Sequence, residues 1–176
     1  MGQYYKIIIL ADNKYTKEVI RAWMCPQSCN CGAKLMEHSY KKSKIVQVLE
    51  YLISPIGMFY KSRIVWAGDY APPEKNEEEN LYQITENKEN LELSIEPSTN
   101  NTFRYVVNHS KQLYVDKEKT SRTHPLPLLV AEGNGQGGGD YEGNDEELCG
   151  TWSRDIISVE ETIPENFEEF ICNFGK

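Results

Sequence analysis

The sequence has no long apolar run and comparatively few basic residues, and both shortages exclude classes of partner. No apolar stretch approaches the roughly 20 residues that a membrane-spanning helix needs. The start, Met1–Asp12, lacks the basic and apolar regions of a signal peptide. We therefore expect a protein of the cytoplasm (the host cytoplasm if it is viral) with no membrane partner. The 19 Lys and Arg residues face 27 Asp and Glu residues, which gives a net charge of −8. Because an acidic chain is not attracted to phosphate backbones, we expect no nucleic-acid partner.

Cysteine is also scarce, at five residues, and the odd number argues against a secreted framework of disulfides. Cys25, Cys29 and Cys31 form a C-x3-C-x-C pattern. One interpretation is a structural zinc site, which would need a fourth ligand and usually has the tighter C-x2-C spacing. The other is a loop, residues 25–32, that carries reduced thiols.

The length of 176 residues and the 39% hydrophobic content predict one domain, residues 1–176, with a substantial core. Aromatic and β-branched runs predict strands at 4–10, 63–67, 103–109, 112–116, 126–131 and 155–159, with shorter candidates at 81–84 and 91–95. Segment 4–10 is apolar on both faces, which is typical of a central strand. Segment 18–23 fits a helix or a strand, and the short turn before it favours a hairpin.

Helical spacing of apolar residues predicts one main helix at about 43–53 and a short C-terminal helix that begins at Pro164. The predicted strands do not alternate with helices. The expected fold class is therefore α+β, with a mainly antiparallel sheet. Two long loops are expected, the acidic 71–80 and the glycine-rich, acidic 133–147.

The stretch from His124 to Trp152 holds the most unusual pattern, an apolar run followed by a glycine-rich loop at 133–143. Glycine allows tight backbone paths and close approach to a neighbour or a ligand. The loop is not a P-loop, because no Gly-Lys-Ser/Thr ends it, and its acidic residues would repel phosphate. One interpretation is a surface loop without a ligand. The other is a functional loop, since apolar segments hold both of its ends.

The tripeptide Gly-Asp-Tyr occurs twice, ending at Tyr70 and at Tyr141. The two sets could face one pocket, with the tyrosine rings stacking on a ligand and Asp69 and Asp140 accepting hydrogen bonds. Asn134 in the glycine-rich loop is a further candidate for ligand binding. Alternatively, the tyrosines pack in the core and the aspartates cap turns.

The three histidines are His38, His109 and His124. Together with a carboxylate such as Asp69 or Asp140, they could hold a divalent metal that activates water. No two of them have the i, i+4 spacing of a zinc-protease helix. The alternative is that each makes a local hydrogen bond at a turn.

Six stretches carry a further pattern: MGQYYK, GAKLMEHSY, RIVWAGDYA, YVVNHSKQLYVD, HPLPLLVAEGNGQGGGDY and GTWSRDIISV. Together they resemble an uncharacterised family of small proteins of tailed phages, bacteria and large DNA viruses. The resemblance spans nearly the whole chain. It implies a single domain and a viral or prophage setting, and it implies no activity. The chain departs from the pattern at CPQSCNCG, where the family has a segment of the type SHDYGNG.

Three functions therefore stay open at this point. The first is a viral or phage accessory protein that binds a small polar molecule, such as a nucleotide, or a host protein at a pocket around the glycine-rich loop. The second is a metal-dependent hydrolase that uses His38, His109 and His124. The third is a structural or assembly protein of a viral particle. The sequence does not decide whether the protein is an enzyme, and it does not set the oligomeric state.

Overall fold

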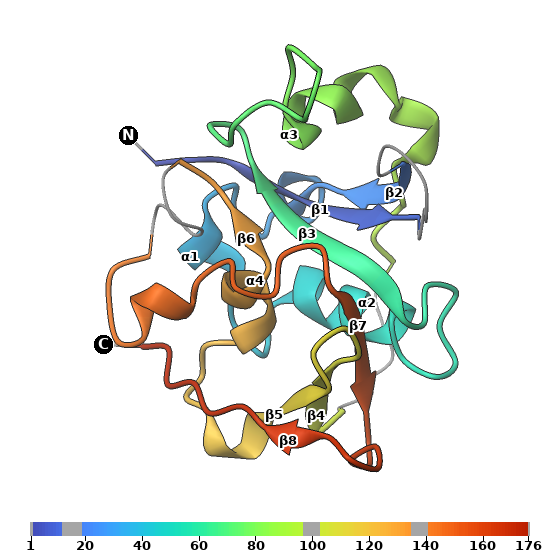
Figure 1. The fold of residues 1–176 in the computed structure, drawn as a ribbon. Helices are drawn as coiled ribbons and strands as arrows, with labels where there is room; N and C mark the ends of the chain where they lie inside the picture. Colours follow the sequence, from blue (N-terminus) through green and yellow to red (C-terminus); the bar gives the residue numbers. More distant parts are fainter. Residues whose placement is uncertain (1, 12–18, 97–102, 135–140, 176) are drawn as a thin grey trace.

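The centre of the fold is a strand that is buried on both faces, as the sequence predicts for segment 4–10. The computed structural model describes residues 2–11, 19–96, 103–134 and 141–175 (Figure 1). In it, strand β1 (Tyr5–Leu10) pairs antiparallel with β2 (Ile20–Met24) on one side and with β3 (Ser62–Gly68) on the other. The predicted hairpin between the first two strands is therefore confirmed.

The sheet has eight strands in the order β2-β1-β3-β7-β4-β5-β8, and β6 pairs with β3 outside this path. Its remaining strands are β4 (Tyr105–Asn108), β5 (Leu113–Asp116), β6 (Ala131–Glu132), β7 (Ile156–Glu160) and β8 (Glu168–Glu169). Most pairs are antiparallel, and the exceptions are β3 with β6 and β5 with β8. The hairpin of β4 and β5 matches its prediction.

The longest helix, α2 (Lys44–Leu52), confirms the predicted main helix. The other elements are short: α1 (Leu35–His38), α3 (Leu81–Ile84), α4 (Pro125–Leu129) and the 3-10 turns η1 (Pro26–Cys29), η2 (Thr85–Asn87), η3 (Glu89–Leu91), η4 (Lys117–Lys119) and η5 (Glu146–Leu148). Across the described ranges, none of these helices has the length and apolarity to cross a bilayer. A mostly antiparallel sheet with few helices confirms the α+β class.

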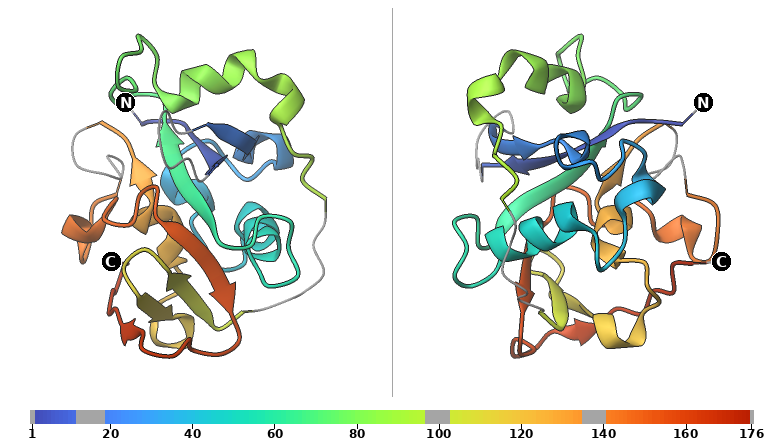
Figure 2. Two further views of the ribbon diagram at one scale, coloured as in Figure 1. Left: turned by 45° about the vertical axis from the view of Figure 1, so that its right-hand side comes forward. Right: turned by 180° about the vertical axis from the view of Figure 1, so that it is seen from behind.

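Apolar side chains pack on both faces of the β1–β3 part of the sheet. Figure 2 shows α3 and α2 on opposite sides of strands β1 and β2. Ile7 and Trp66 belong to the main core, which also contains apolar residues of α2 and α4. Ile8 and Val65 point to the other face, where a smaller core includes Leu81 of α3. The alternation of side chains along a strand produces this division.

The structure corrects two strand predictions, because segments 126–131 and 81–84 are mainly helical. A continuous apolar run cannot distinguish a buried strand from a buried helix by its periodicity. Pro125 occupies the first helical turn of α4, and the His124 side chain caps it by accepting a hydrogen bond from the Leu126 N–H. Asn80 and Gln83 form a capping box at the start of α3.

The predicted C-terminal helix is also wrong. The segment after Pro164 is extended and contributes β8, which pairs in parallel with β5. Phe167 and Phe170 are only half-buried, and Ile171 is 71% exposed, so these residues do not form one apolar helix face. Segment 91–95 is likewise not a regular strand, and it contributes an isolated bridge from Glu92 to Trp23. Segment 71–80 is a loop, as expected, and residues 135–140 of the glycine-rich loop lie outside the described residues.

Candidate functional site

The glycine-rich segment starts where two parallel strands end side by side. Trp66 pairs with Ala131 and Ala67 with Glu132, so the carboxyl ends of β3 and β6 lie at the same edge. The backbones are close there, because a Cβ on Gly68 would sit 3.0 Å from the Glu132 carbonyl oxygen. The Asn134 N–H donates to Oε1 of Gln3 at 2.7 Å, which fixes the first residues of the segment.

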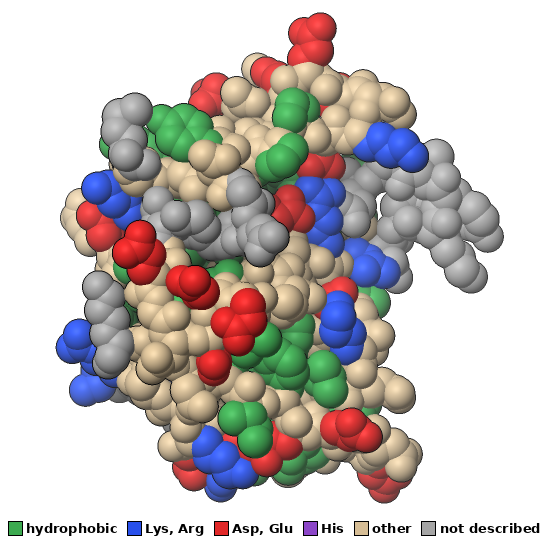
Figure 3. All heavy atoms as spheres, turned by 60° about the vertical axis from the view of Figure 1, so that its left-hand side comes forward, with side chains coloured by type: hydrophobic (Ala, Val, Ile, Leu, Met, Phe, Trp, Pro, Cys, Tyr) green, Lys and Arg blue, Asp and Glu red, His purple; other side chains and the backbone are tan. Residues whose placement is uncertain are grey.

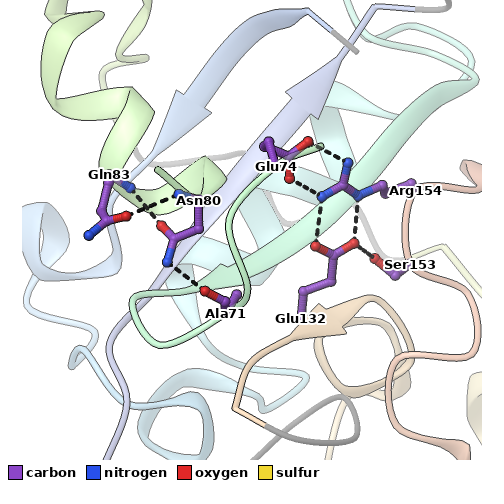
Figure 4. A network of polar contacts seen from close by, with 7 residues as sticks. All are labelled: Ala71, Glu74, Asn80, Gln83, Glu132, Ser153 and Arg154. Atoms are coloured by element: carbon purple, nitrogen blue, oxygen red, sulfur yellow. Dashed lines mark hydrogen bonds and ion pairs between the residues drawn. The ribbon is translucent and has the colours of Figure 1, made fainter. Parts of the chain in front are cut away.

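Arg154 joins this edge to two other parts of the chain (Figure 4). Its Nη1 and Nη2 donate to the two carboxylate oxygens of Glu74 at 2.9 and 2.5 Å. Its Nε and Nη2 donate to the two oxygens of Glu132 at 2.6 and 2.8 Å. The Ser153 hydroxyl adds a 2.6 Å hydrogen bond to Glu132. One guanidinium thus makes bidentate contacts with two carboxylates, the geometry to which its planar group of donors is suited.

Backbone geometry explains how these groups reach one another. Arg154 has φ of 64° and accordingly lies in the left-handed region, right after the tight turn at Gly150–Ser153. On the other side, Asn80 donates to the carbonyls of Asp69 and Ala71 at 3.0 and 2.9 Å. These two bonds fold segment 69–80 back toward the sheet, and Glu74 lies within it.

Electrostatics keep the arginine charged at this site. Burial lowers the pKa of Arg154, but the hydrogen bonds and charges of Glu74 and Glu132 outweigh burial and raise it above its ordinary value. The arginine side chain is 24% exposed, and the two carboxylates are 19% and 27% exposed. The cluster is thus partly open to solvent, while five hydrogen bonds among Glu74, Glu132, Ser153 and Arg154 fix its geometry. A ligand could contact these carboxylates without first ordering them.

A cavity of about 620 Å³ lies beside this cluster. It is lined by residues of all three joined segments, among them Pro73, Glu74, Glu132, Gly133, Thr151 and Arg154. Glu147 and Lys75 also contribute to its wall. The volume is within the range of about 300–1,000 Å³ that is common for small-molecule sites.

The two tyrosines of the Gly-Asp-Tyr sets have different surroundings in the structure. Asp69 holds the backbone of Tyr4, since its Oδ1 accepts the Tyr4 N–H at 3.0 Å, and Tyr70 is 48% exposed. Tyr141 is buried against Phe174, with ring centroids 5.5 Å apart, and it lines a different cavity from the one beside Arg154. Asp140 lies outside the described residues. The two tyrosines therefore have different surroundings, contrary to the shared pocket that the repeated tripeptide suggests.

Each histidine is held by its own internal contacts. His38 accepts a hydrogen bond from Trp66 Nε1 at 2.8 Å, and its Nδ1 lies 3.2 Å from the Gly32 carbonyl oxygen, to which it donates. The Nε2 atom of His124 lies 2.5 Å from Glu50 Oε1, and its Nδ1 caps α4. His109 bonds to the Ser158 hydroxyl at 2.7 Å.

The predicted metal centres have no counterpart in the described part of the chain. No three His, Cys, Asp or Glu residues there are grouped so that they could hold a metal ion. Burial is the main reason that the pKa of each histidine is lowered, to about 4 for His38. Cys29 and Cys31 form a disulfide, while Cys25 is a free thiol. The disulfide contradicts both interpretations of the C-x3-C-x-C pattern, because a zinc site and a loop of reduced thiols each require Cys29 and Cys31 to be unoxidised.

Sequence reasoning identified the region of this cluster but missed Glu74, Ser153 and Arg154 as site residues. Arg154 lies within GTWSRDIISV, one of the stretches that carry the family resemblance, and this was the available signal. Glu74 lies in a run of acidic residues that composition alone indicates as solvated loop. Searches against models of known families, curated proteins and solved structures find no match to the chain.

Proposed function

We propose that the protein is a non-enzymatic binding module of viral or phage origin that takes a small polar molecule in the cavity beside Arg154. The observation that carries this proposal is the position of the cavity, at the start of the glycine-rich segment and against two carboxylates that Arg154 holds in place. The resemblance to a phage and viral family supports the biological setting.

The chemistry of the wall favours a ligand rich in hydrogen-bond donors. Carboxylates only accept hydrogen bonds, and those of Glu74 and Glu132 keep lone pairs beyond the ones that Arg154 and Ser153 use. Glu74, Glu132 and Glu147 also outnumber Arg154 and Lys75 in charge. The side of the molecule with β6 and η5 shows acidic side chains grouped at its middle (Figure 3). A sugar-like polyol or an amine fits such a wall better than an anion.

Ligand-observed NMR tests this proposal. The probes are ribose, glucose, N-acetylglucosamine and spermidine. Each is used at about 1 mM, so that a complex with a Kd as weak as about 1 mM is still detected. We expect saturation transfer to at least one probe. Glu147→Gln removes an exposed carboxylate from the cavity wall and should weaken that binding, whereas Glu161→Gln, an exposed residue outside the cavity, should not.

Glu132→Gln gives the stronger test because it alters the carboxylate at the centre of the cluster. We expect it to abolish binding of the same probe, and a thermal melt and a ¹H–¹⁵N spectrum establish that the variant is folded. The proposal is refuted if none of the four probes shows saturation transfer. It is also refuted if Glu147→Gln and Glu132→Gln both bind the probe as well as the wild-type protein does.

Assembly with a second copy of the chain is the second candidate function, and it has an observation of its own. The turn after α2 exposes two apolar side chains, Ile56 at 69% and Met58 at 77%. Exposed apolar groups of this kind are common at protein interfaces. Sedimentation velocity between 5 and 200 µM should then show a dimer that the double substitution Ile56→Ser, Met58→Ser disrupts. A wild-type monomer over this range would rule the candidate out.

A further inference from the structure

A short antiparallel bridge brings two basic segments together at the far end of the glycine-rich segment. Tyr40 pairs with Thr123. Two backbone hydrogen bonds flank this pair, from the Lys41 N–H to the Arg122 carbonyl at 3.1 Å and from the His124 N–H to the Ser39 carbonyl at 3.0 Å. The bridge therefore fixes the backbones from which Tyr40, Lys41 and Arg122 project.

Two cavities meet at this bridge and share Tyr40 and Arg122 as a common wall. The first, of about 470 Å³, is lined also by Met36, Ser121, Thr123, Tyr141 and Glu142. We call it the aromatic lobe. The second, of about 510 Å³, is lined by Lys41 and Lys42 together with the shared pair. We call it the cationic lobe.

The cationic lobe concentrates positive charge in a protein whose net charge is −8. Among the residues that the structure describes, three cations line it and no acidic side chain does. Lys41 is held in place, since its ammonium donates to the carbonyls of Lys117 and Thr120 at 2.5 and 2.9 Å. Lys42 and Arg122 are exposed, and within residues 2–11, 19–96, 103–134 and 141–175 neither is ion-paired with an acidic side chain. Their charges are thus available to an anion.

The aromatic lobe has a complementary character. Tyr40 and Tyr141 supply aromatic surface, and Met36 supplies a flexible apolar side chain. The Arg122 guanidinium carbon lies 5.6 Å from the centre of the Tyr40 ring, so the guanidinium group makes a cation–π contact with this ring. Of the described residues that line either lobe, Glu142 alone is a carboxylate, and it lies in the aromatic lobe.

We infer that the two lobes together bind a mononucleotide. The phosphate would lie in the cationic lobe against Lys42 and Arg122, where charge-assisted hydrogen bonds to phosphate are strongest. The base would lie in the aromatic lobe beside Tyr40, and Glu142 would accept a hydrogen bond from a base amine or a ribose hydroxyl. The separation of Glu142 from the lysines matches a ligand that is anionic at one end and donates hydrogen bonds at the other.

This site is independent of the cavity beside Arg154. In the described part of the chain the two sites share no lining residue. They also differ in charge, since glutamates dominate one and cations the other. If no polyol or amine binds beside Arg154, the proposed nucleotide site is not affected. Each site can be tested in a variant that carries a substitution at the other site.

Calorimetric titration with adenosine monophosphate, adenosine and inorganic phosphate tests the inference. At 50 mM NaCl, we expect adenosine monophosphate to bind at least tenfold more tightly than adenosine or phosphate alone. Arg122→Ala should weaken its binding at least tenfold. Lys44→Ala, which removes an equal charge from a neighbouring exposed lysine that does not line the lobe, should change it less than twofold.

Substitution of Tyr40 separates stacking from charge. Tyr40→Phe keeps the ring and should bind like the wild-type protein, whereas Tyr40→Leu should weaken binding about tenfold, the effect of losing one base–aromatic stack. No heat from adenosine monophosphate at 5 mM would overturn the inference. So would phosphate that binds as tightly as the nucleotide, because the aromatic lobe would then contribute nothing. A normal melting temperature confirms that each variant is folded.

Discussion

The Nε2 atom of His124 and Oε1 of Glu50 lie 2.5 Å apart in the interior, between helix α4 and helix α2. The same glutamate oxygen accepts a 2.5 Å hydrogen bond from the Lys117 ammonium. His124 is fully buried, and the side chains of Glu50 and Lys117 are 5% and 11% exposed. One carboxylate therefore satisfies two buried polar groups that come from different parts of the sequence.

Removal of this carboxylate should destabilise the protein strongly. Glu50→Ala leaves the Lys117 ammonium and His124 without their partner, and breaking a buried ion pair in this way typically costs about 3–5 kcal/mol. Urea unfolding followed by circular dichroism measures the free energy of unfolding. Glu161→Ala, at an exposed position, is the control and should stay within about 0.5 kcal/mol of the wild type. A loss below 1 kcal/mol for Glu50→Ala would contradict the structure.

The buried histidines predict that stability falls between pH 7 and pH 5. Burial lowers the pKa of His38 from 6.5 to about 4, so below pH 6.5 the unfolded chain takes up a proton that the folded chain does not. The stabilisation is therefore complete above pH 6.5 and is lost as the pH falls toward 4. His38 alone should contribute a loss of about 2 kcal/mol between pH 7 and pH 5. His109 and His124 act in the same direction.

His38→Gln tests the assignment of this effect. The amide can replace the imidazole as acceptor from Trp66 and as donor to Gly32, but it does not titrate. The free energy of unfolding of the variant should then change less between pH 7 and pH 5 than that of the wild type, whatever its value at pH 7. Carboxyl groups with lowered pKa, such as Glu37 and Asp116, act only below this window. If the free energy of unfolding depends on pH in the same way in both proteins, a group other than His38 causes the effect.

The cysteines should react in three distinct stages. Cys25 is a half-buried free thiol, whereas Cys149 and Cys172 are buried, and burial raises the pKa of Cys172 to about 12. The native protein should therefore react with Ellman's reagent at Cys25 alone. Denaturation should expose the thiols of Cys149 and Cys172, and reduction should add Cys29 and Cys31. Five reactive thiols in denatured protein that has not been reduced would contradict the disulfide.

Arg154→Lys should show that shape as well as charge is needed at the Glu74–Glu132 cluster. Lysine keeps the charge but cannot make bidentate contacts with two carboxylates at once. We expect the free energy of unfolding to fall by about 2 kcal/mol or more, because both carboxylates lose partners. Arg21→Lys, at an exposed site, is the matched control and should change it by less than about 0.5 kcal/mol. Equal values for the two variants would show that the cluster does not stabilise the fold.

The elements that were predicted correctly are those in which local pattern and tertiary environment agree. Strand β1 alternates between two apolar environments, and α2 has apolar residues at helical spacing with Ser43 before its first turn. Segment 126–131 is different, because its apolar residues are buried on every side and carry no periodicity. The two prolines and the capping His124 decided in favour of a helix there.

The site was predicted less completely, since it depends on contacts between residues far apart in the sequence. The glycine-rich segment begins at the edge of the sheet where Glu132 lies, but nothing in its sequence indicates the partners of Glu132. No local pattern connects Glu74 with Arg154, which are 80 positions apart, because only the return of segment 69–80 over the sheet brings them together. The histidines misled for the same reason. Their rarity suggested a common metal centre, whereas in the structure His38 is hydrogen-bonded to Trp66 and His124 to Glu50.

The position of β3 has a consequence for how the chain folds. One edge of β3 pairs with β1, and among the described residues its other edge is completed by Ala131–Glu132 and by Ile156–Ile157. During synthesis, at about 5–20 residues per second, that second edge stays open for several seconds while the later strands are still being made. Open strand edges invite pairing with other chains. Refolding should therefore be slow, as is usual for non-local pairing, and the yield of native protein should fall as its concentration rises.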